Sequence, residues 1–175
     1  MVKYIECGRP AVFSPEYPVR PTRADDLFFI LEVHASFTRA YPPAGRLVDL
    51  QALEAGFQLT YLHLDLTTPS YFVIEEAASG KRAGYLLINP SDLVAGARTF
   101  YVYDVAIAPE FSGRGLSRFL QAAAESVAAV EGGFVYGDGS LESPALASWH
   151  AQMGYSVDTI RFGLPCSETP KFQSP

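Results

Sequence analysis

Two glycines in the second half of the chain have the spacing and the neighbours of an anion-binding turn. Gly113 and Gly115 lie in the sequence Ser-Gly-Arg-Gly, directly before a segment with helical spacing. Glycine lets a ligand approach the backbone, and the first N–H groups of a helix have no partner inside it. The helix dipole adds partial positive charge there, and Arg114 and Arg118 add full charges. The segment suits an anion, most naturally phosphate, although a tight turn that needs glycine only for geometry is the alternative.

Two well-known phosphate loops do not match this segment. The Rossmann fingerprint requires a third glycine at the position of Arg118. The P-loop requires Gly-Lys-Ser/Thr after a four-residue gap, and the sequence supplies none here. The hypothesis of a phosphate-sensing or nucleotide-binding domain is therefore supported by the glycines alone.

The glycine segment lies between a predicted strand and a predicted helix. Residues 100–107 are rich in β-branched and aromatic side chains, which favours a strand, and Pro109 ends it because proline has no N–H. Apolar residues then recur every three to four positions, which predicts a helix that stops at Gly132-Gly133. The predicted apolar face of this helix carries Leu116, Phe119, Leu120, Ala123, Val127 and Val130.

Two segments of the chain resemble motifs of the GCN5-related N-acetyltransferases. Residues 105–117 (VAIAPEFSGRGLS) are similar to the family's acyl-CoA-binding motif. Ser112 stands where Arg or Gln is usual in that motif, and Ser117 stands where Gly or Ala is usual. Residues 143–155 (SPALASWHAQMGY) resemble the family's downstream motif, with Ser143 where Asn is common. The resemblance spans about residues 20 to 163, which is most of the chain.

The resemblance implies an N-acetyltransferase that moves an acetyl group from acetyl-CoA directly to a primary amine of a small molecule or peptide. Direct transfer is expected because neither motif contains a cysteine to carry the acyl group. A non-catalytic module that binds acyl-CoA or a protein partner is the alternative. The residues implied to bind acetyl-CoA are Val105, Ala106, Ile107, Ser112, Gly113, Arg114, Gly115, Leu116, Ser117, Arg118 and Ser143.

Asp104 and His150 are the candidates for proton transfer. Asp104 is a carboxylate in an otherwise apolar and aromatic strand, where Asp is disfavoured, so it is the candidate general base. By simple alternation it shares a face with Phe100, Val102 and Ala106. The resemblance places His150 where the family often has a tyrosine that acts as the acid. A structural Asp104 bonded to a neighbouring loop, and a His150 that only positions acetyl-CoA, are the alternatives.

Tyr41 and His34 are the candidate contacts for the acceptor amine. The resemblance implies that the connector between the first two helices, which contains Tyr41, forms one wall of the acceptor pocket. His34 lies on the apolar side of the first predicted helix, where a packed histidine is the alternative. Among all residues, no His/Cys spacing fits zinc, so we expect no metal.

The order of elements predicts one α/β domain with a mixed sheet flanked by helices. The resemblance implies that the two parallel strands around the main helix splay apart and admit the pantetheine arm. Turns are expected at 78–81 and 89–92, an irregular arm at 1–18 and a mobile tail at 164–175. The other expected elements are strands at 17–21, 59–67, 70–77, 83–89, 98–107, 134–138 and 155–162, helices at about 25–41 and 44–57, and a short helix from Pro144.

Composition narrows the class of protein. The chain has 175 residues, of which 49% are apolar and 18% charged, which predicts one globular domain. No apolar run could span a membrane and no signal pattern is present, so we expect a cytoplasmic protein. Cys7 and Cys166 are expected to be free thiols. A net charge of −6 argues against nucleic acid and fits a cationic amine, and a homodimer is common in the resembled family.

Overall fold

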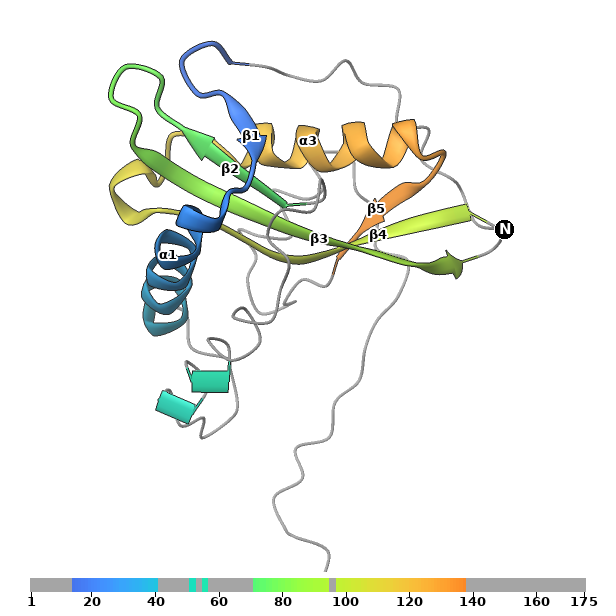
Figure 1. The fold of residues 1–175 in the computed structure, drawn as a ribbon, viewed down its shortest axis with the longest axis horizontal. Coiled ribbons are helices and arrows are strands. Elements are labelled where there is room, and N and C mark those ends of the chain that lie inside the picture. Colours follow the sequence, from blue (N-terminus) through green and yellow to red (C-terminus); the bar gives the residue numbers. More distant parts are fainter. Residues whose placement is uncertain (1–13, 41–50, 53–54, 57–70, 95–96, 138–175) are drawn as a thin grey trace, which may run out of the picture.

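The described part of the chain is a five-stranded sheet with helices against both faces. The structure is a computed structural model that describes residues 14–40, 51–52, 55–56, 71–94 and 97–137 (Figure 1). The sheet order follows the sequence, β1-β2-β3-β4-β5. The strands are β1 (Val19–Pro21), β2 (Tyr71–Glu75), β3 (Arg82–Val94), β4 (Ala97–Ile107) and β5 (Phe134–Tyr136). The helices are η1 (Ala24–Asp26), α1 (Leu27–Ala40), η2 (Pro109–Phe111) and α3 (Ser117–Val130).

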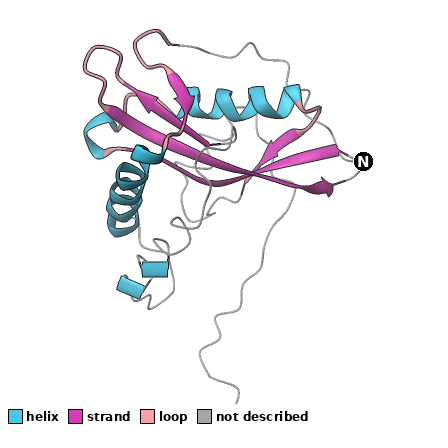
Figure 2. Cartoon of the chain, in the orientation of Figure 1, coloured by secondary structure: helices cyan, strands magenta, loops and turns pink. Residues whose placement is uncertain are grey.

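The sheet is mixed, as expected. Strands β1 to β4 pair antiparallel, whereas β5 runs parallel to β4. A parallel pair needs a crossover connection, and η2 and α3 provide it (Figure 2). The glycine segment is therefore the turn that leads out of β4 into the crossover helix.

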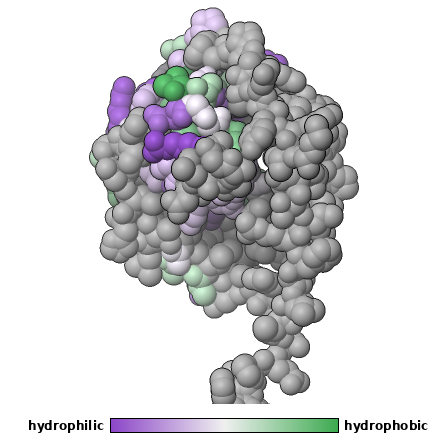
Figure 3. Space-filling model, turned by 90° about the vertical axis from the view of Figure 1, so that its right-hand side faces the viewer, coloured by the Kyte–Doolittle hydropathy of each residue, from purple (hydrophilic) through white to green (hydrophobic). Residues whose placement is uncertain are grey.

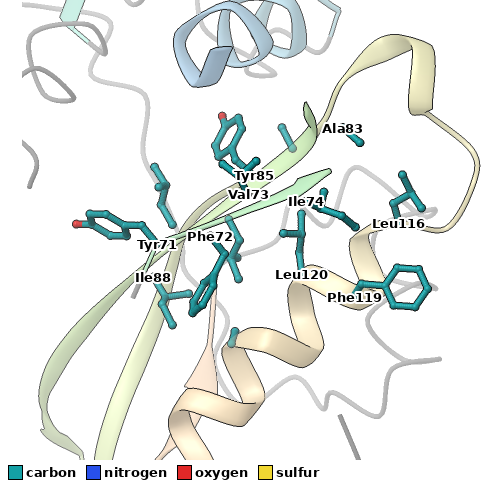
Figure 4. Packing of buried hydrophobic residues seen from close by; sticks show 14 of the residues in the cluster. Tyr71, Phe72, Val73, Ile74, Ala83, Tyr85, Ile88, Leu116, Phe119 and Leu120 are labelled. Carbon is teal, nitrogen blue, oxygen red and sulfur yellow. The ribbon is translucent and has the colours of Figure 1, made fainter. Parts of the chain in front are cut away.

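Strand β3 lies at the centre of the sheet and is buried from both sides. Tyr85, Leu86, Leu87 and Ile88 are all fully buried. Alternation directs Ile88 towards α3 and Tyr85 towards α1, and Figure 4 shows these two opposite directions. A strand that is covered on both faces needs apolar residues at consecutive positions, which explains the uninterrupted apolar run of β3.

The crossover helix α3 packs with the apolar face predicted for it, except at its end. Leu116, Phe119 and Leu120 are buried, as expected. Val130 is 86% exposed, so its predicted burial is wrong. The buried line continues from Leu120 at every fourth residue, through Ala124 and Ala128, and Val130 is turned by about 200° from the last of these. In the view onto the end of the molecule where α3 meets β5, the described surface shows hydrophobic residues beside hydrophilic ones (Figure 3).

The turn expected at residues 89–92 is wrong. Strand β3 continues to Val94, and Pro90 pairs with Phe100 of β4. Strand β2 covers β3 only as far as Leu87, so beyond that point the other edge of β3 has no partner among the described strands. Proline is tolerated on such an edge because its missing N–H breaks no ladder there.

A cluster of charges joins β1, β3 and the start of α1. Asp26 is fully buried, and its carboxylate accepts hydrogen bonds from Arg20 at 2.7 and 2.9 Å. Arg82 donates to the same carboxylate at 2.6 Å, and the backbone N–H of Arg23 donates at 2.7 Å. Arg20 also binds Glu75 at 2.5 Å. The first turn of α1 is thereby fixed to the sheet.

Several expectations fall outside the described residues. These include the arm up to residue 13, most of the second helix, the strand at 59–67 and everything from residue 138 onward. Residues 51–52 and 55–56, within the expected second helix, are helical. Of the helices in the described ranges, none combines the length and apolarity needed to cross a membrane.

Candidate functional site

Strand β4 is paired along only part of the edge that faces β5. Its parallel pairing with β5 covers Thr99, Phe100 and Tyr101 and then ends. From residue 102 to Ile107, this edge has no partner among the strands that the structure describes. Unpaired strand edges present rows of N–H and C=O groups. The described pairing with β5 thus covers the first part of this edge, and residues 102–107 lead from there towards the glycine turn.

A β-bulge at Tyr103 changes the face on which Asp104 lies. Leu87 of β3 pairs with Asp104 and the next residue, Ile88, pairs with Val102, so Tyr103 is an extra residue in β4. The extra residue shifts the alternation by one, which places Asp104 and Val102 on opposite faces. The expectation that Asp104 shares a face with Phe100 and Val102 is therefore wrong.

On its own face, Asp104 meets a histidine of α1 and a tyrosine of β3. His34 Nδ1 lies 2.9 Å from Asp104 Oδ2, and the hydroxyl of Tyr85 donates to the same oxygen at 2.6 Å. Tyr85 is fully buried, whereas the side chains of His34 and Asp104 are 17% and 16% exposed. Asp104 is thus bonded to a helix and a neighbouring strand, and two of the three groups retain contact with solvent.

The turn after β4 has the geometry that glycine permits. Gly113 and Gly115 have φ angles of 76° and 70°, in the left-handed region that other residues rarely adopt. Space does not explain them, because an added Cβ at either position would meet no heavy atom within 4 Å. The exposed residues 112–115 lie between two buried anchors, Phe111 and Leu116. The turn is therefore fixed at both ends, and its backbone is exposed at the start of α3.

The two arginines of the turn lie against protein groups. Arg114 donates to the hydroxyl of Tyr17 at 3.0 Å and to the carbonyl oxygen of Glu110 at 3.2 Å. Its guanidinium also lies 4.9 Å from the ring centre of Phe111. Arg118, one turn into the helix, lies over the ring of Phe119 at 4.7 Å. One positive charge thus lies between the two glycines, and another follows them near the start of α3.

A pocket of about 460 Å³ opens beyond the end of β4, beside α1. Charged residues of both signs line this pocket: Glu32 and Glu110 are acidic, and Lys81 and Arg82 are basic. The remaining lining residues are Phe29, Val33, Ser36, Gly80, Ala108 and Pro109. Within the described ranges, no group of His, Cys, Asp and Glu side chains could hold a metal ion.

The structure brings together two of the residues that sequence patterns single out. His34 and Asp104 are 70 residues apart in sequence and lie in contact. Residues 105–107 end strand β4, and residues 112–118 form the turn and the start of α3, with η2 between the two stretches. Tyr41, Ser143 and His150 lie outside the described residues. The sequence patterns did not identify Tyr85 as a site residue. The one feature that could have indicated it is its hydroxyl group within the apolar run AGYLLIN.

Comparisons with solved structures find the same fold in acetyltransferases. A GNAT-family acetyltransferase from Listeria monocytogenes has a TM-score of 0.64 at 17% identity, with 83% of this chain and 89% of that chain covered. Glucosamine-6-phosphate N-acetyltransferase from Arabidopsis thaliana has a TM-score of 0.52 at 21% identity, with 85% and 97% covered. An aminoglycoside acetyltransferase from an uncultured soil sample, solved with sisomicin, has a TM-score of 0.58 at 13% identity, with 85% and 95% covered.

Sequence comparison defines the family directly. No curated protein sequence matches the chain significantly. The family model of the acetyltransferase (GNAT) family, however, matches residues 30–155, which include β4, the glycine turn and the Asp104 cluster. Because that match covers more than half of the chain, the protein belongs to the GNAT acetyltransferase family.

Proposed function

We propose that the protein transfers an acetyl group from acetyl-CoA directly to the primary amine of a small molecule or peptide. The observation that carries this proposal is the edge of β4 from residue 102 to Ile107, which has no partner among the described strands and is followed, after η2, by the exposed glycine turn. A pantetheine arm contains amide groups, and a strand edge offers them N–H and C=O partners. The turn then offers backbone N–H groups to phosphates at the end of the same path.

In this proposal each part of the path has its own task. The backbone of Val105, Ala106 and Ile107 holds the pantetheine amides and polarises the thioester carbonyl. The exposed residues 112–115 and the start of α3 bind the pyrophosphate, with Arg114 and Arg118 supplying charge. Ser143 contributes from the downstream motif.

The chemical step needs a base and a proton for the leaving group. The amine nitrogen attacks the thioester carbonyl carbon, a C–N bond forms, and the C–S bond breaks. The amine proton passes to the cluster that contains Asp104, and the thiolate takes up a proton. His150 is the proposed donor of that proton.

Three observations support an amine acceptor. The fold is shared with enzymes whose names specify an aminoglycoside and glucosamine 6-phosphate, both of which are amine compounds. The net charge of −6 favours the approach of a cation. The side chains of His34, on α1, and Asp104 are in contact and are 17% and 16% exposed, so an acceptor can reach them from solvent. We propose that His34 and Tyr41 line the acceptor side, and that the enzyme acts in the cytoplasm.

Calorimetric titration tests the first half of the proposal. Acetyl-CoA should bind with a micromolar dissociation constant, which corresponds to about 8 kcal/mol of binding free energy, while ATP and NAD should bind far more weakly. Equal or stronger binding of ATP would contradict an acetyl-CoA site and favour a nucleotide-binding domain.

A thiol-release assay tests the second half. Wild-type protein with acetyl-CoA and a panel of amines that includes glucosamine 6-phosphate, sisomicin and polyamines should release CoA thiol in proportion to the acetylated amine. The departures at Ser112 and Ser143 favour one other function, a non-catalytic acyl-CoA-binding module. Tight binding of acetyl-CoA without thiol release for any amine would support that module and contradict the enzyme.

A further inference from the structure

We propose that His34 accepts the proton from the attacking amine, and that Asp104 holds the imidazole in the form that can accept it. This inference rests on the proposed acetyl transfer. It changes the assignment of the base, because Asp104 becomes a positioning residue and a histidine from α1 becomes the catalytic group.

The first argument is how the Asp104 carboxylate is bonded. Its Oδ2 atom accepts a hydrogen bond from the Tyr85 hydroxyl at 2.6 Å and lies 2.9 Å from His34 Nδ1. The Tyr85 hydroxyl also lies 3.5 Å from His34 Nδ1, so the three groups converge on one point. An oxygen that accepts the Tyr85 hydrogen bond and lies beside the imidazole is placed to orient His34.

The second argument is what this contact does to the imidazole. A carboxylate oxygen can only accept, so His34 donates through Nδ1–H. In neutral histidine the proton on Nδ1 leaves Nε2 as the basic nitrogen. A carboxylate that fixes the tautomer of a histidine in this manner also stabilises the imidazolium that forms when the histidine takes up a proton. Asp104 and His34 therefore have complementary roles.

The third argument is the position of the pair relative to the acyl site. Asp104 directly precedes Val105, the first residue of the proposed carbonyl-polarising edge. The bulge at Tyr103 turns Asp104 to the α1 face, where His34 lies. The orienting carboxylate is thereby one residue from the proposed acyl site, and the base that it orients lies on the side of the sheet that carries α1.

The balanced step follows from this geometry. As the amine nitrogen bonds to the acyl carbon, its proton moves to Nε2 of His34, and the resulting imidazolium is paired with the Asp104 carboxylate. The C–S bond breaks, and the thiolate takes up a proton from His150 or water. His34 returns its proton to solvent before the next turnover.

The test compares four variants with matched chemistry. His34→Gln removes the base, Asp104→Asn removes the orienting charge, and Tyr85→Phe removes only one donor to that charge. His63→Gln controls for the loss of a histidine elsewhere. The amine used is the best one found in the thiol-release panel, and acetyl-CoA affinity and thermal unfolding are measured for every variant.

We expect His34→Gln to lower kcat by roughly 10²-fold or more, in line with the contribution of a general base. Acetyl-CoA affinity should stay within about threefold, because the proposed pantetheine contacts come from the backbone of residues 105–107 and not from the His34 side chain. The acid limb of the kcat/KM profile against pH should disappear in this variant. Asp104 from β4 and Tyr85 from β3 are titratable groups in contact with His34, so Tyr85→Phe should move the limb without removing it. His63→Gln should behave as wild type.

Imidazole rescue keeps the test decisive if the glutamine variant is unstable. Added imidazole should restore part of the activity of His34→Ala and none of the activity of Asp104→Asn.

Nitrogen NMR of the histidine side chains gives a readout that does not depend on turnover. The chain has three histidines, so the His34 signals can be assigned from the variant. Wild type should show the Nδ1–H tautomer for His34, and Asp104→Asn should shift that equilibrium.

The outcomes separate this inference from the proposed function. If the wild type is active and His34→Gln keeps both its kcat and the acid limb of its pH profile, His34 is not the base. Asp104 would then again be the candidate general base. A wild type that binds acetyl-CoA but releases no thiol with any amine would end the proposed enzyme, and this inference with it. An Nε2–H tautomer of His34 in the wild-type protein would also contradict it.

Discussion

The guanidinium of Arg20 donates two hydrogen bonds, 2.7 and 2.9 Å long, to the carboxylate of the fully buried Asp26. A bidentate pair of this kind has a fixed geometry. Because Arg20 belongs to β1 and Asp26 directly precedes α1, the pair sets the position of α1 over the sheet. His34 lies on that helix, so the pair also supports the candidate site.

Asp26→Asn should destabilise the protein strongly. The variant leaves Arg20 and Arg82 without the charge that they surround, and breaking one side of a buried ion pair typically costs about 3–5 kcal/mol. Denaturant unfolding should report this loss. Asp25→Asn is the matched control, because Asp25 is largely exposed and binds only the rim of the cluster through Arg82. Its cost should stay below about 1 kcal/mol, and equal losses in the two variants would contradict the importance of the buried pair.

The same cluster of charges should make the free energy of unfolding depend on pH in the acid range. Burial acts to raise the pKa of Asp26, but hydrogen bonds from Arg20, the Arg23 backbone and Arg82 outweigh it and hold the pKa below its usual range. A lowered folded pKa stabilises the protein above the unfolded value of about 3.9, and this contribution is lost as the pH falls through the folded value. Wild type should therefore lose unfolding free energy below about pH 4 more steeply than Asp26→Asn. Parallel curves for the two proteins would contradict this.

Gly115→Ala should weaken acetyl-CoA binding as well as stability. Alanine in the left-handed region costs about 1–2 kcal/mol, and relief of that strain would move the backbone N–H groups of the turn. Gly132→Ala provides the control, because Gly132 has nearly the same φ of 67° but lies at the far end of α3. Both variants should lose similar stability in unfolding experiments. Only Gly115→Ala should raise the dissociation constant of acetyl-CoA in calorimetry, and equal affinities would leave the turn with a purely structural role.

Arg114→Glu should weaken acetyl-CoA binding at least tenfold, or about 1.4 kcal/mol, because it reverses a charge beside the proposed phosphates. The effect should shrink at high salt. Tyr17→Phe is the control, since it removes one hydrogen bond to the guanidinium and leaves the charge in place. Unchanged affinity in Arg114→Glu would show that this arginine serves its contacts within the protein, which include Tyr17, Glu110 and Phe111, rather than acetyl-CoA.

Local features were the ones that sequence could predict. Residues close together in sequence determine the strand, the glycine turn and the crossover helix. The positive φ angles of Gly113 and Gly115 are also a local feature. The termination at Gly132-Gly133 is another, since Gly132 also has a positive φ directly after α3. The mixed sheet followed from the order of elements.

The rest depended on partners that are distant in sequence. Alternation could not reveal the bulge at Tyr103, because the extra residue is defined only by its pairing with β3. The contact between His34 and Asp104 joins segments 70 residues apart, and no periodicity in either segment indicates the other. Pro90 suggested a turn because proline ends most strands, but an edge without a partner removes that restriction.

The bulge at Tyr103 also means that the proposed chemistry depends on the register of β4 as well as on residue identity. If β4 continued past Val102 without the bulge, Tyr103 would pair with Leu87, and strict alternation would return Asp104 to the face of Val102. The carboxylate would then project towards α3, and His34 would lose its partner. A substitution that abolished the bulge would therefore separate the two groups while leaving both of them in the chain.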